Sequence, residues 1–139
     1  MVVYSAEITL DTEEEIQIID ITLQVRNIIK DSGIKSGLVN VFNPGATGAI
    51  TTMEYEPRLV EDTINFMKRI IPKGIGYQHD YQDDNAHSHL LASLFSPEIT
   101  VTVANFEPIL GTYQQIVFFE LDTRGRERKI AVTVIGDKK

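Results

Sequence analysis

The chain has 139 residues, of which 42% are hydrophobic and 24% charged; its formal net charge is −7 and it contains no cysteine. This length predicts one domain spanning residues 1–139, with a core of its own. The lack of cysteine excludes a disulfide scaffold, a thiolate metal site and a cysteine nucleophile. A chain this acidic is a poor candidate for binding nucleic acid or an anionic membrane surface. Because no segment has the pattern of a secretory signal or a membrane span, we expect a cytoplasmic protein.

The first third of the chain predicts a strand followed by a helix. Val2–Leu10 alternates loosely between apolar and polar residues, as a half-buried strand does. Asp20 is placed to cap a helix, and Gly33 to end it in a left-handed conformation. The apolar residues between them recur at helical spacing: Ile21, Val25, Ile28 and Ile29.

Two further strands and a second helix follow. Gly37–Phe42 and Ala49–Glu54 are predicted strands, separated by the break at Asn43-Pro44-Gly45. Pro57 fits the first turn of a helix that Pro72 ends. One face of this helix is apolar, comprising Leu59, Val60, Ile64, Met67 and Ile71.

The remaining segments complete an α+β pattern. Residues 73–85 have loop composition, and Asn85 can cap a short helix that ends near Phe95. Three strand-like runs follow, with turns at 108–111 and 124–126, and we expect them to form a mostly antiparallel meander: Ile99–Ala104, Tyr113–Leu121 and Lys129–Ile135. Strands, then helices, then strands are typical of an α+β domain.

All three histidines lie within eleven residues, at positions 79, 87 and 89. Histidine is a common zinc ligand and the usual acid or base near neutral pH. On a helix, however, His87 and His89 would diverge by about 200°. We therefore expect that they do not share a metal and that one lies on the surface; the helical pattern leaves open which one. The alternative is that the histidines are solvated loop and cap residues.

A metal site built on these histidines needs a carboxylate from elsewhere. Glu54 is the natural candidate, because a carboxylate that ends a buried strand needs a partner. Two histidines and one carboxylate with an open position are an ordinary catalytic metal arrangement.

Two other segments are candidate anion sites. The one basic cluster, Arg124–Lys129, can clamp a phosphate, although the alternative is a solvated hairpin turn. The small-residue turn Pro44–Ala49 can present backbone amides to an anion, although its spacing alone favours a plain β-turn. Leu110–Gln115 contains hydroxyl and amide side chains, which alone are weak evidence for a binding site.

Taken together, these segments resemble the YjbQ family, also called the secondary thiamine-phosphate synthase family. Four stretches match the family in order: Phe42–Glu54, His79–His89, the run Leu-Gly-Thr-Tyr-Gln at 110–114, and Asp122–Arg128 followed by a strand. The most specific element is His-Asp … Asn-x-x-x-His followed by Leu-Gly-Thr-aromatic-Gln.

The resemblance implies an α+β fold of packed mixed or antiparallel sheets, sandwich-like, with helices on one side. It also implies a homotrimer with sites at subunit interfaces. The implied catalytic and metal residues are His79, His89 and Glu54; the implied substrate-binding residues are Asn85, Thr112, Gln114, Arg126 and Arg128. His87 matches no family position. The histidine of the family's His-Thr-Ser-Ala stretch is replaced by the run at 45–48, so a third ligating histidine is absent.

The activity that the family name implies joins a pyrimidine pyrophosphate to a thiazole phosphate and releases pyrophosphate. This activity is regarded as secondary in the family, so it does not identify the native substrate. The implied cofactor is a divalent metal, zinc or magnesium, and the implied partner is a small phosphorylated molecule. The alternative is a non-catalytic trimeric module that binds an anion or a metal.

Overall fold

The computed structural model describes residues 1–139 as eight strands, three α-helices and one 3₁₀ helix. The strands are β1 (Val2–Asp11), β2 (Gln17–Asp20), β3 (Ser36–Phe42), β4 (Gly48–Met53), β5 (Glu98–Ala104), β6 (Glu107–Pro108), β7 (Gln115–Glu120) and β8 (Glu127–Asp137). The helices are α1 (Thr22–Ser32), α2 (Pro57–Ile70), the 3₁₀ helix η1 (Gln78–Tyr81) and α3 (Ala86–Phe95).

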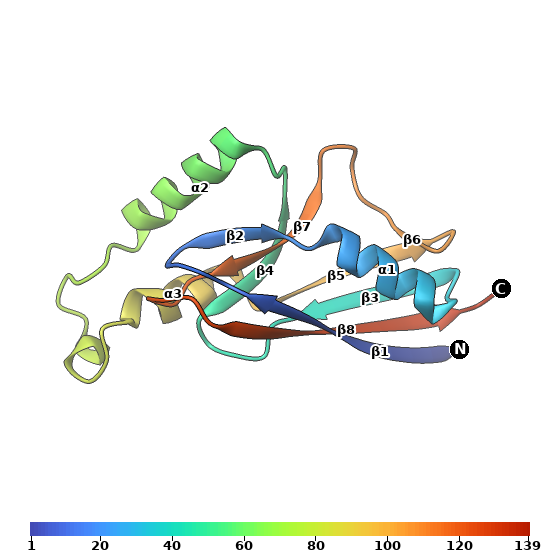
Figure 1. Cartoon of the computed structure of the whole chain (residues 1–139), viewed down its shortest axis with the longest axis horizontal. Helices are drawn as coiled ribbons and strands as arrows, with labels where there is room; N and C mark the ends of the chain where they lie inside the picture. The colour runs from blue at the N-terminus through green and yellow to red at the C-terminus, as the bar shows by residue number, and fades with distance from the viewer.

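The strands form two antiparallel sheets. The larger sheet has the order β1-β8-β3-β5-β6, and the smaller has the order β2-β7-β4. Strands β1 and β8 pair along their whole length, from Val2 opposite Gly136 to Asp11 opposite Glu127. Helix α1 lies toward the end of the molecule that carries both termini, whereas α2 and α3 lie toward the other end (Figure 1).

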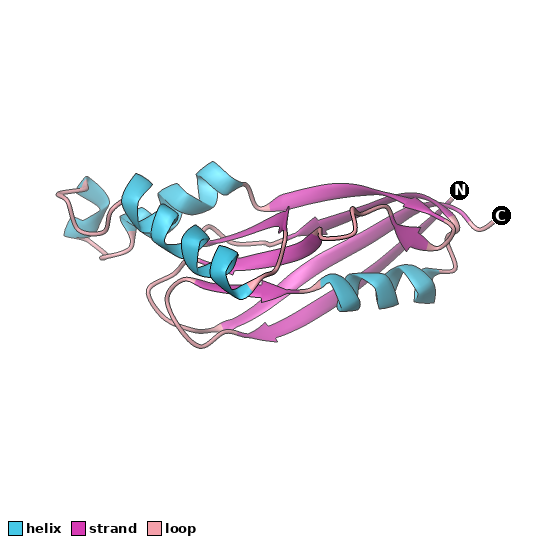
Figure 2. Ribbon diagram, turned by 90° about the horizontal axis from the view of Figure 1, so that it is seen from above, coloured by secondary structure: helices cyan, strands magenta, loops and turns pink.

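The smaller sheet is the middle layer of the molecule. Ile116 and Phe118 of β7 pack into a core shared with α1 and the larger sheet. Their neighbours Val117 and Phe119 point the other way, into a second core with α2 and α3. The helices and sheets are seen from above in Figure 2. Because both faces of β7 are covered, its sequence is a continuous apolar run and not an alternating one.

Most predicted elements are confirmed, and the α+β class with packed antiparallel sheets is confirmed as well. Gly33 ends α1 at φ 70°, and Pro57 opens α2. The loop 73–85 contains one unpredicted element, η1. No helix has both the length and the apolar character needed to cross a membrane.

The predicted meander of the last three strands is wrong. Strand β5 pairs with β3 and β6, β8 lies between β1 and β3, and β7 belongs to the other sheet. The turn at 124–126 is therefore not a hairpin but a connection between sheets. The reason lies in β7, whose four consecutive apolar residues need cover on both faces and are placed in the middle layer.

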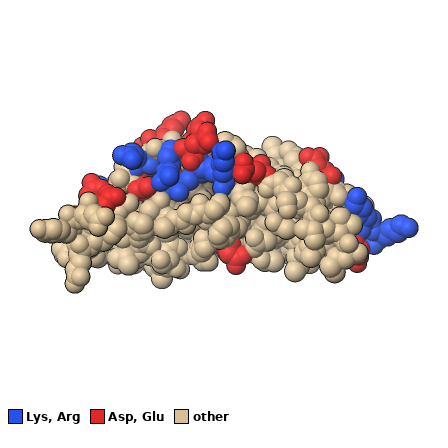
Figure 3. Space-filling model, turned by 90° about the horizontal axis from the view of Figure 1, so that it is seen from below, with Lys and Arg blue, Asp and Glu red and all other residues tan.

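The outer surface has an uneven distribution of charge. Seen from below, many acidic and basic side chains gather in one mixed patch, a smaller and mainly basic group lies at one end of the molecule, and much of the rest of that face carries few charges (Figure 3). On the uncovered face of the larger sheet, Val3, Ile135 and Leu38 are cross-strand neighbours, and all three are exposed. This row of exposed apolar side chains has no cover within the chain.

Candidate functional site

The two candidate anion-binding segments meet at one polar cavity. The turn between β3 and β4, the loop between β7 and β8 and the start of α3 surround a volume of about 480 Å³. The cavity is lined by Pro44, Gly45, Ala46, Thr47, Asp83, Asp84, Asn85, His89, Asp122, Thr123, Arg124, Arg126 and Arg128. Sequence segments that lie some 80 residues apart therefore contribute to one site.

A buried ion pair fixes the base of this cavity. Glu120 at the end of β7 has no exposed surface, and Arg128 of β8 is 5% exposed. The guanidinium donates to Glu120 from Nε at 2.9 Å and again from Nη2. Nη2 also donates to the backbone oxygen of Thr47 at 3.1 Å and to its hydroxyl at 3.0 Å. Arg128 thus holds both loops of the cavity in place.

Arg128 was predicted as a substrate-binding residue, and the structure places it at the cavity with most of its donors already used. Only Nη1 takes part in none of these hydrogen bonds. The guanidinium also lies over the ring of Phe118, 5.6 Å from its centroid. The main role of Arg128 in the free protein is therefore to neutralise Glu120, whose buried charge would otherwise be uncompensated.

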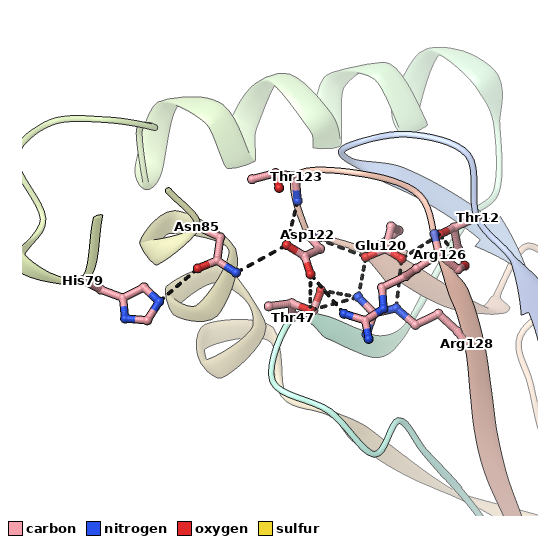
Figure 4. A network of polar contacts seen from close by, with 9 residues as sticks. All are labelled: Thr12, Thr47, His79, Asn85, Glu120, Asp122, Thr123, Arg126 and Arg128. Atoms are coloured by element: carbon pink, nitrogen blue, oxygen red, sulfur yellow. Dashed lines mark hydrogen bonds and ion pairs between the residues drawn. The ribbon is translucent and has the colours of Figure 1, made fainter. Parts of the chain in front are cut away.

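Asp122 is the centre of a second set of hydrogen bonds, drawn in Figure 4. Its carboxylate accepts from the Thr123 backbone N–H at 2.8 Å, the Thr47 hydroxyl at 3.2 Å and Arg126 Nη1 at 3.2 Å. Asn85 Nδ2 donates to it at 3.4 Å. Burial alone would raise the pKa of Asp122, but these hydrogen bonds outweigh it and lower the pKa below the usual value of 3.8.

Asn85 connects Asp122 to the histidines. Because its Nδ2 donates to Asp122, its Oδ1 is free to accept from His79 Nε2, which lies 3.0 Å away. The His79 ring in turn meets the His89 ring edge to face, with the centroids 4.9 Å apart. The prediction that the Asn85 side chain caps α3 is wrong, because it makes no capping hydrogen bond. Asp80 Oδ1 instead accepts from the Ala86 N–H at 2.9 Å.

His89 borders more than one cavity. It lines the polar cavity and also a more apolar one of about 360 Å³, which it shares with Tyr77, His79, Ala86 and Leu90. Helix η1 brings His79 to this place by folding the loop back onto α3. Two imidazoles and three arginines are therefore present at the cavity or directly beside it.

His87 points away from this site. It lies on α3, as predicted, and shares no cavity with His89. The expectation that one of the two is a surface residue is wrong, because His87 is 3% exposed and His89 is half-buried. His87 Nε2 lies 2.6 Å from Glu15 Oε1.

Three predicted site residues lie elsewhere in the chain. Glu54 is exposed and follows the far end of β4 from the cavity. Gln114 donates to the Thr52 hydroxyl at 2.9 Å, and neither it nor Thr112 lines the polar cavity. No three His, Asp or Glu side chains lie together as possible metal ligands, so one chain does not assemble His79, His89 and Glu54.

Reasoning from the sequence missed Thr47, Glu120 and Asp122 as members of this network. One signal was available: Glu120 directly ends an apolar strand, and a buried carboxylate needs a cation. The nearby basic run supplies it through Arg128.

Comparison with known proteins agrees with this architecture. A family model described as UPF0047 protein YjbQ-like matches residues 6–137. The chain belongs to the YjbQ family. A UPF0047 protein of Methanothermobacter thermautotrophicus is 41% identical, covering 98% of this chain and 94% of the relative. A UPF0047 protein of Archaeoglobus fulgidus is 40% identical, covering 93% and 99%.

Solved structures of family members have the same fold. A YbjQ-like protein of unknown function from Sulfolobus solfataricus superposes with a TM-score of 0.95 at 36% identity, covering 97% of this chain and 98% of that one. A YjbQ/UPF0047 protein of Clostridium acetobutylicum gives a TM-score of 0.88 at 34% identity, covering 94% and 99%. The predicted family and the predicted fold are therefore both confirmed.

Proposed function

We propose that the polar cavity binds the phosphate or pyrophosphate group of a small phosphorylated molecule. The observation that carries this proposal is that the small-residue turn, Pro44–Ala49, meets the arginine loop at one cavity of about 480 Å³. The arginine loop is the connection between β7 and β8 that contains Arg124 and Arg126. Each segment alone is an ordinary turn or a solvated loop. Their convergence gives backbone amides and guanidinium groups a common ligand volume, as phosphate binding requires.

The donors differ in how far they are already engaged. Arg124 is exposed and forms no ion pair, so its guanidinium is free for a ligand. Arg126 is about half exposed and is held by Asp122 at one nitrogen. Arg128 has one nitrogen left. Arg124 and Arg126 therefore supply most of the anion affinity, while Arg128 supports the loops.

The reaction that we propose is the transfer implied by the family name. A thiazole nitrogen attacks the methylene carbon of the pyrimidine pyrophosphate, the new C–N bond forms, and the C–O bond to pyrophosphate breaks. The arginines stabilise the charge that develops on the leaving pyrophosphate. His89, at the edge of the cavity, can donate a proton to that group. Asp122 cannot, because its depressed pKa keeps it ionised.

The remaining predicted residues favour a homotrimer. Glu54, Thr112 and Gln114 lie away from the cavity within one chain, so a neighbouring protomer would have to bring them to it. The exposed apolar row on the larger sheet is a suitable contact surface for a second copy. The predicted metal set likewise needs Glu54 of a neighbouring protomer beside His79 and His89.

The second candidate function is a non-catalytic anion-binding module. This candidate is favoured because one chain does not assemble a complete set of metal ligands. The two candidates differ in whether bound phosphate compounds turn over.

Calorimetric titration with pyrophosphate tests the binding proposal. Arg126→Gln should weaken binding about tenfold, because it removes a charge-assisted hydrogen bond. The matched control is Arg69→Gln, an exposed arginine of α2 outside the cavity, which should bind as the parent does. Equal weakening in both variants would contradict the proposed site.

Turnover is tested by measuring thiamine phosphate formation with the purified protein. His89→Ala should bind pyrophosphate but lose turnover. If the parent binds pyrophosphate and forms no thiamine phosphate, the non-catalytic module is favoured. If His89→Ala turns over as the parent does, the assignment of His89 as proton donor is wrong.

The assembly is tested by mixing two variants that should each have reduced activity, Arg126→Gln and Gln114→Ala. Arg126 lines the polar cavity, whereas Gln114 directly precedes β7, at the end of the β4–β7 pair that lies away from the cavity. When the two variants are unfolded and refolded together, mixed trimers should contain some intact sites and recover part of the activity. A chain that sediments as a monomer would contradict the trimer.

A further inference from the structure

A second cavity lies on the opposite side of α3 from the proposed phosphate site. It has a volume of about 330 Å³. Ile16, Ile71 and Leu91 form its apolar lining. Four charged or titratable side chains complete it: Glu15, Lys68, Lys73 and His87. Neither the phosphate site nor the predicted metal set uses any of these residues.

The polar part of this cavity is preorganised. His87 comes from α3, and its Nε2 lies 2.6 Å from Glu15 Oε1. The other oxygen of Glu15 accepts from Lys73 Nζ at 3.1 Å. Three segments, the β1–β2 connection, the loop after α2 and helix α3, are therefore joined at one point.

Two features of these residues have no structural explanation within the chain. His87 Nδ1 has no hydrogen-bond partner, and it is buried because the residue is only 3% exposed. Ile16, which follows Glu15, has φ 44°, a left-handed conformation that is unfavourable for a β-branched residue. Unsatisfied buried polar atoms and strained backbone gather at ligand sites, where a ligand can satisfy the atom or justify the strain.

The charged side chains that line this cavity favour a ligand of negative charge. Glu15 neutralises Lys73, and Lys68 has no ion pair in the chain. The cavity therefore has one uncompensated cation at its rim, in a protein whose net charge is −7. Ile16 and Leu91 are buried whereas Lys68 is exposed, so this apolar lining lies deeper than the cation. The volume of about 330 Å³ lies at the small end of the range for small-molecule sites.

We infer that this cavity binds a small organic carboxylate with an apolar body. The carboxylate faces Lys68, and the apolar body packs against Ile71 and Leu91. This site is separate from the phosphate cavity and does not depend on the function proposed for it.

The inference is tested with hexanoate as the probe, followed by nuclear magnetic resonance of ¹⁵N-labelled protein. Hexanoate should shift the amide signals of Ile16 and Leu91 and leave those of Arg124 and Arg126 unchanged. Hexanol and hexylamine have the same chain length without the negative charge, and they should bind at least about tenfold more weakly. The outcome that overturns the inference is either equal binding of all three compounds or no binding of hexanoate at about 10 mM.

The charge at the rim is tested by Lys68→Glu. This residue is exposed, so the variant should fold, and it should weaken hexanoate binding about tenfold or more. The matched control is Arg69→Glu, the same charge reversal on the next residue of α2, which does not line the cavity. Equal weakening in the two variants would show a general charge effect and would overturn the site. Shifts confined to Arg124 and Arg126 would instead place hexanoate in the phosphate cavity and would also overturn it.

Discussion

The two ends of the β4–β7 strand pair are built in opposite ways. At one end, Gly48 lies opposite Glu120, and the buried charge of Glu120 is held by Arg128. At the other end, Met53 lies opposite Gln115, and neutral amide groups make the hydrogen bonds. There the Gln115 side chain accepts from the Tyr55 N–H at 2.8 Å.

A glutamate stands at each of these ends, and the comparison shows which of them needs a partner. Glu120 ends a strand whose two faces are both covered, so its carboxylate is enclosed and its partner is obligatory. Glu54 follows β4 into solvent and makes no hydrogen bond or ion pair within the chain. Both strands belong to the smaller sheet, but β7 is its central strand and β4 is an edge strand. The position of a strand within the sheet therefore decides whether its terminal charge is buried.

The largest expected effect is at the buried end. Glu120→Gln removes the charge that neutralises Arg128, and we expect it to lower the free energy of unfolding by about 3 kcal/mol. Urea denaturation measures the loss. Replacing both partners, as Glu120→Leu with Arg128→Met, should restore much of it, because no buried charge is then left unpaired. A double variant less stable than Glu120→Gln would show that the pair does more than neutralise itself.

Asp122 should show a smaller loss that depends on pH. Its folded pKa lies below the usual 3.8, so its stabilisation is complete above that pH and is lost as the pH falls through the folded pKa. Asp122→Asn should therefore reduce stability by about 2 kcal/mol at pH 7, and by less at pH 3. Urea denaturation at the two pH values tests this difference.

Asp62→Asn is the matched control for this pH test. Asp62 is exposed on α2 and makes no hydrogen bond or ion pair. The substitution should change stability by less than about 0.5 kcal/mol at both pH values. A loss for Asp122→Asn that stays the same at pH 3 would contradict the role of the ionised carboxylate.

The fold was predictable where local pattern decides and not where distant segments pair. Helix α1 follows from apolar spacing and from Gly33, whose left-handed conformation ends it. The sheet order does not, because pairing β8 with both β1 and β3 joins segments from opposite ends of the chain. Nothing local to β8 distinguishes these partners from the β7 that precedes it.

The candidate site was predictable in its parts but not in its assembly. The small-residue turn and the arginine loop were each identified as anion-binding candidates, and each had a plain structural alternative. Only the three-dimensional structure brings them to one cavity. The proximity of His79 and His89 required the loop to fold back, and η1 provides that fold. Asn85 was expected to cap a helix, whereas Asp80 performs that role and leaves Asn85 to the site.

The capping interaction of Asp80 predicts an intermediate effect. Its carboxylate satisfies the Ala86 N–H at the start of α3, so Asp80→Ala should reduce stability by about 1 kcal/mol. Thermal unfolding measures this loss. Asp83→Ala, three residues along the same loop and exposed, is the control and should have no effect beyond about 0.5 kcal/mol. Equal losses would show that the charge of the loop matters and the cap does not.

The smallest effect is expected at the end of the β4–β7 pair where Glu54 lies. The change from glutamate to glutamine is the same one that should be most destabilising at Glu120. In the dissociated chain, at low protein concentration, Glu54→Gln should change the free energy of unfolding by less than about 0.5 kcal/mol, because Glu54 is exposed and unpaired within the chain. Urea denaturation at two protein concentrations measures it. A loss comparable to that of Glu120→Gln would mean that Glu54 is also enclosed in the folded protein. Since nothing in its own chain encloses it, the enclosing group would have to come from another copy, and the loss should then increase with protein concentration.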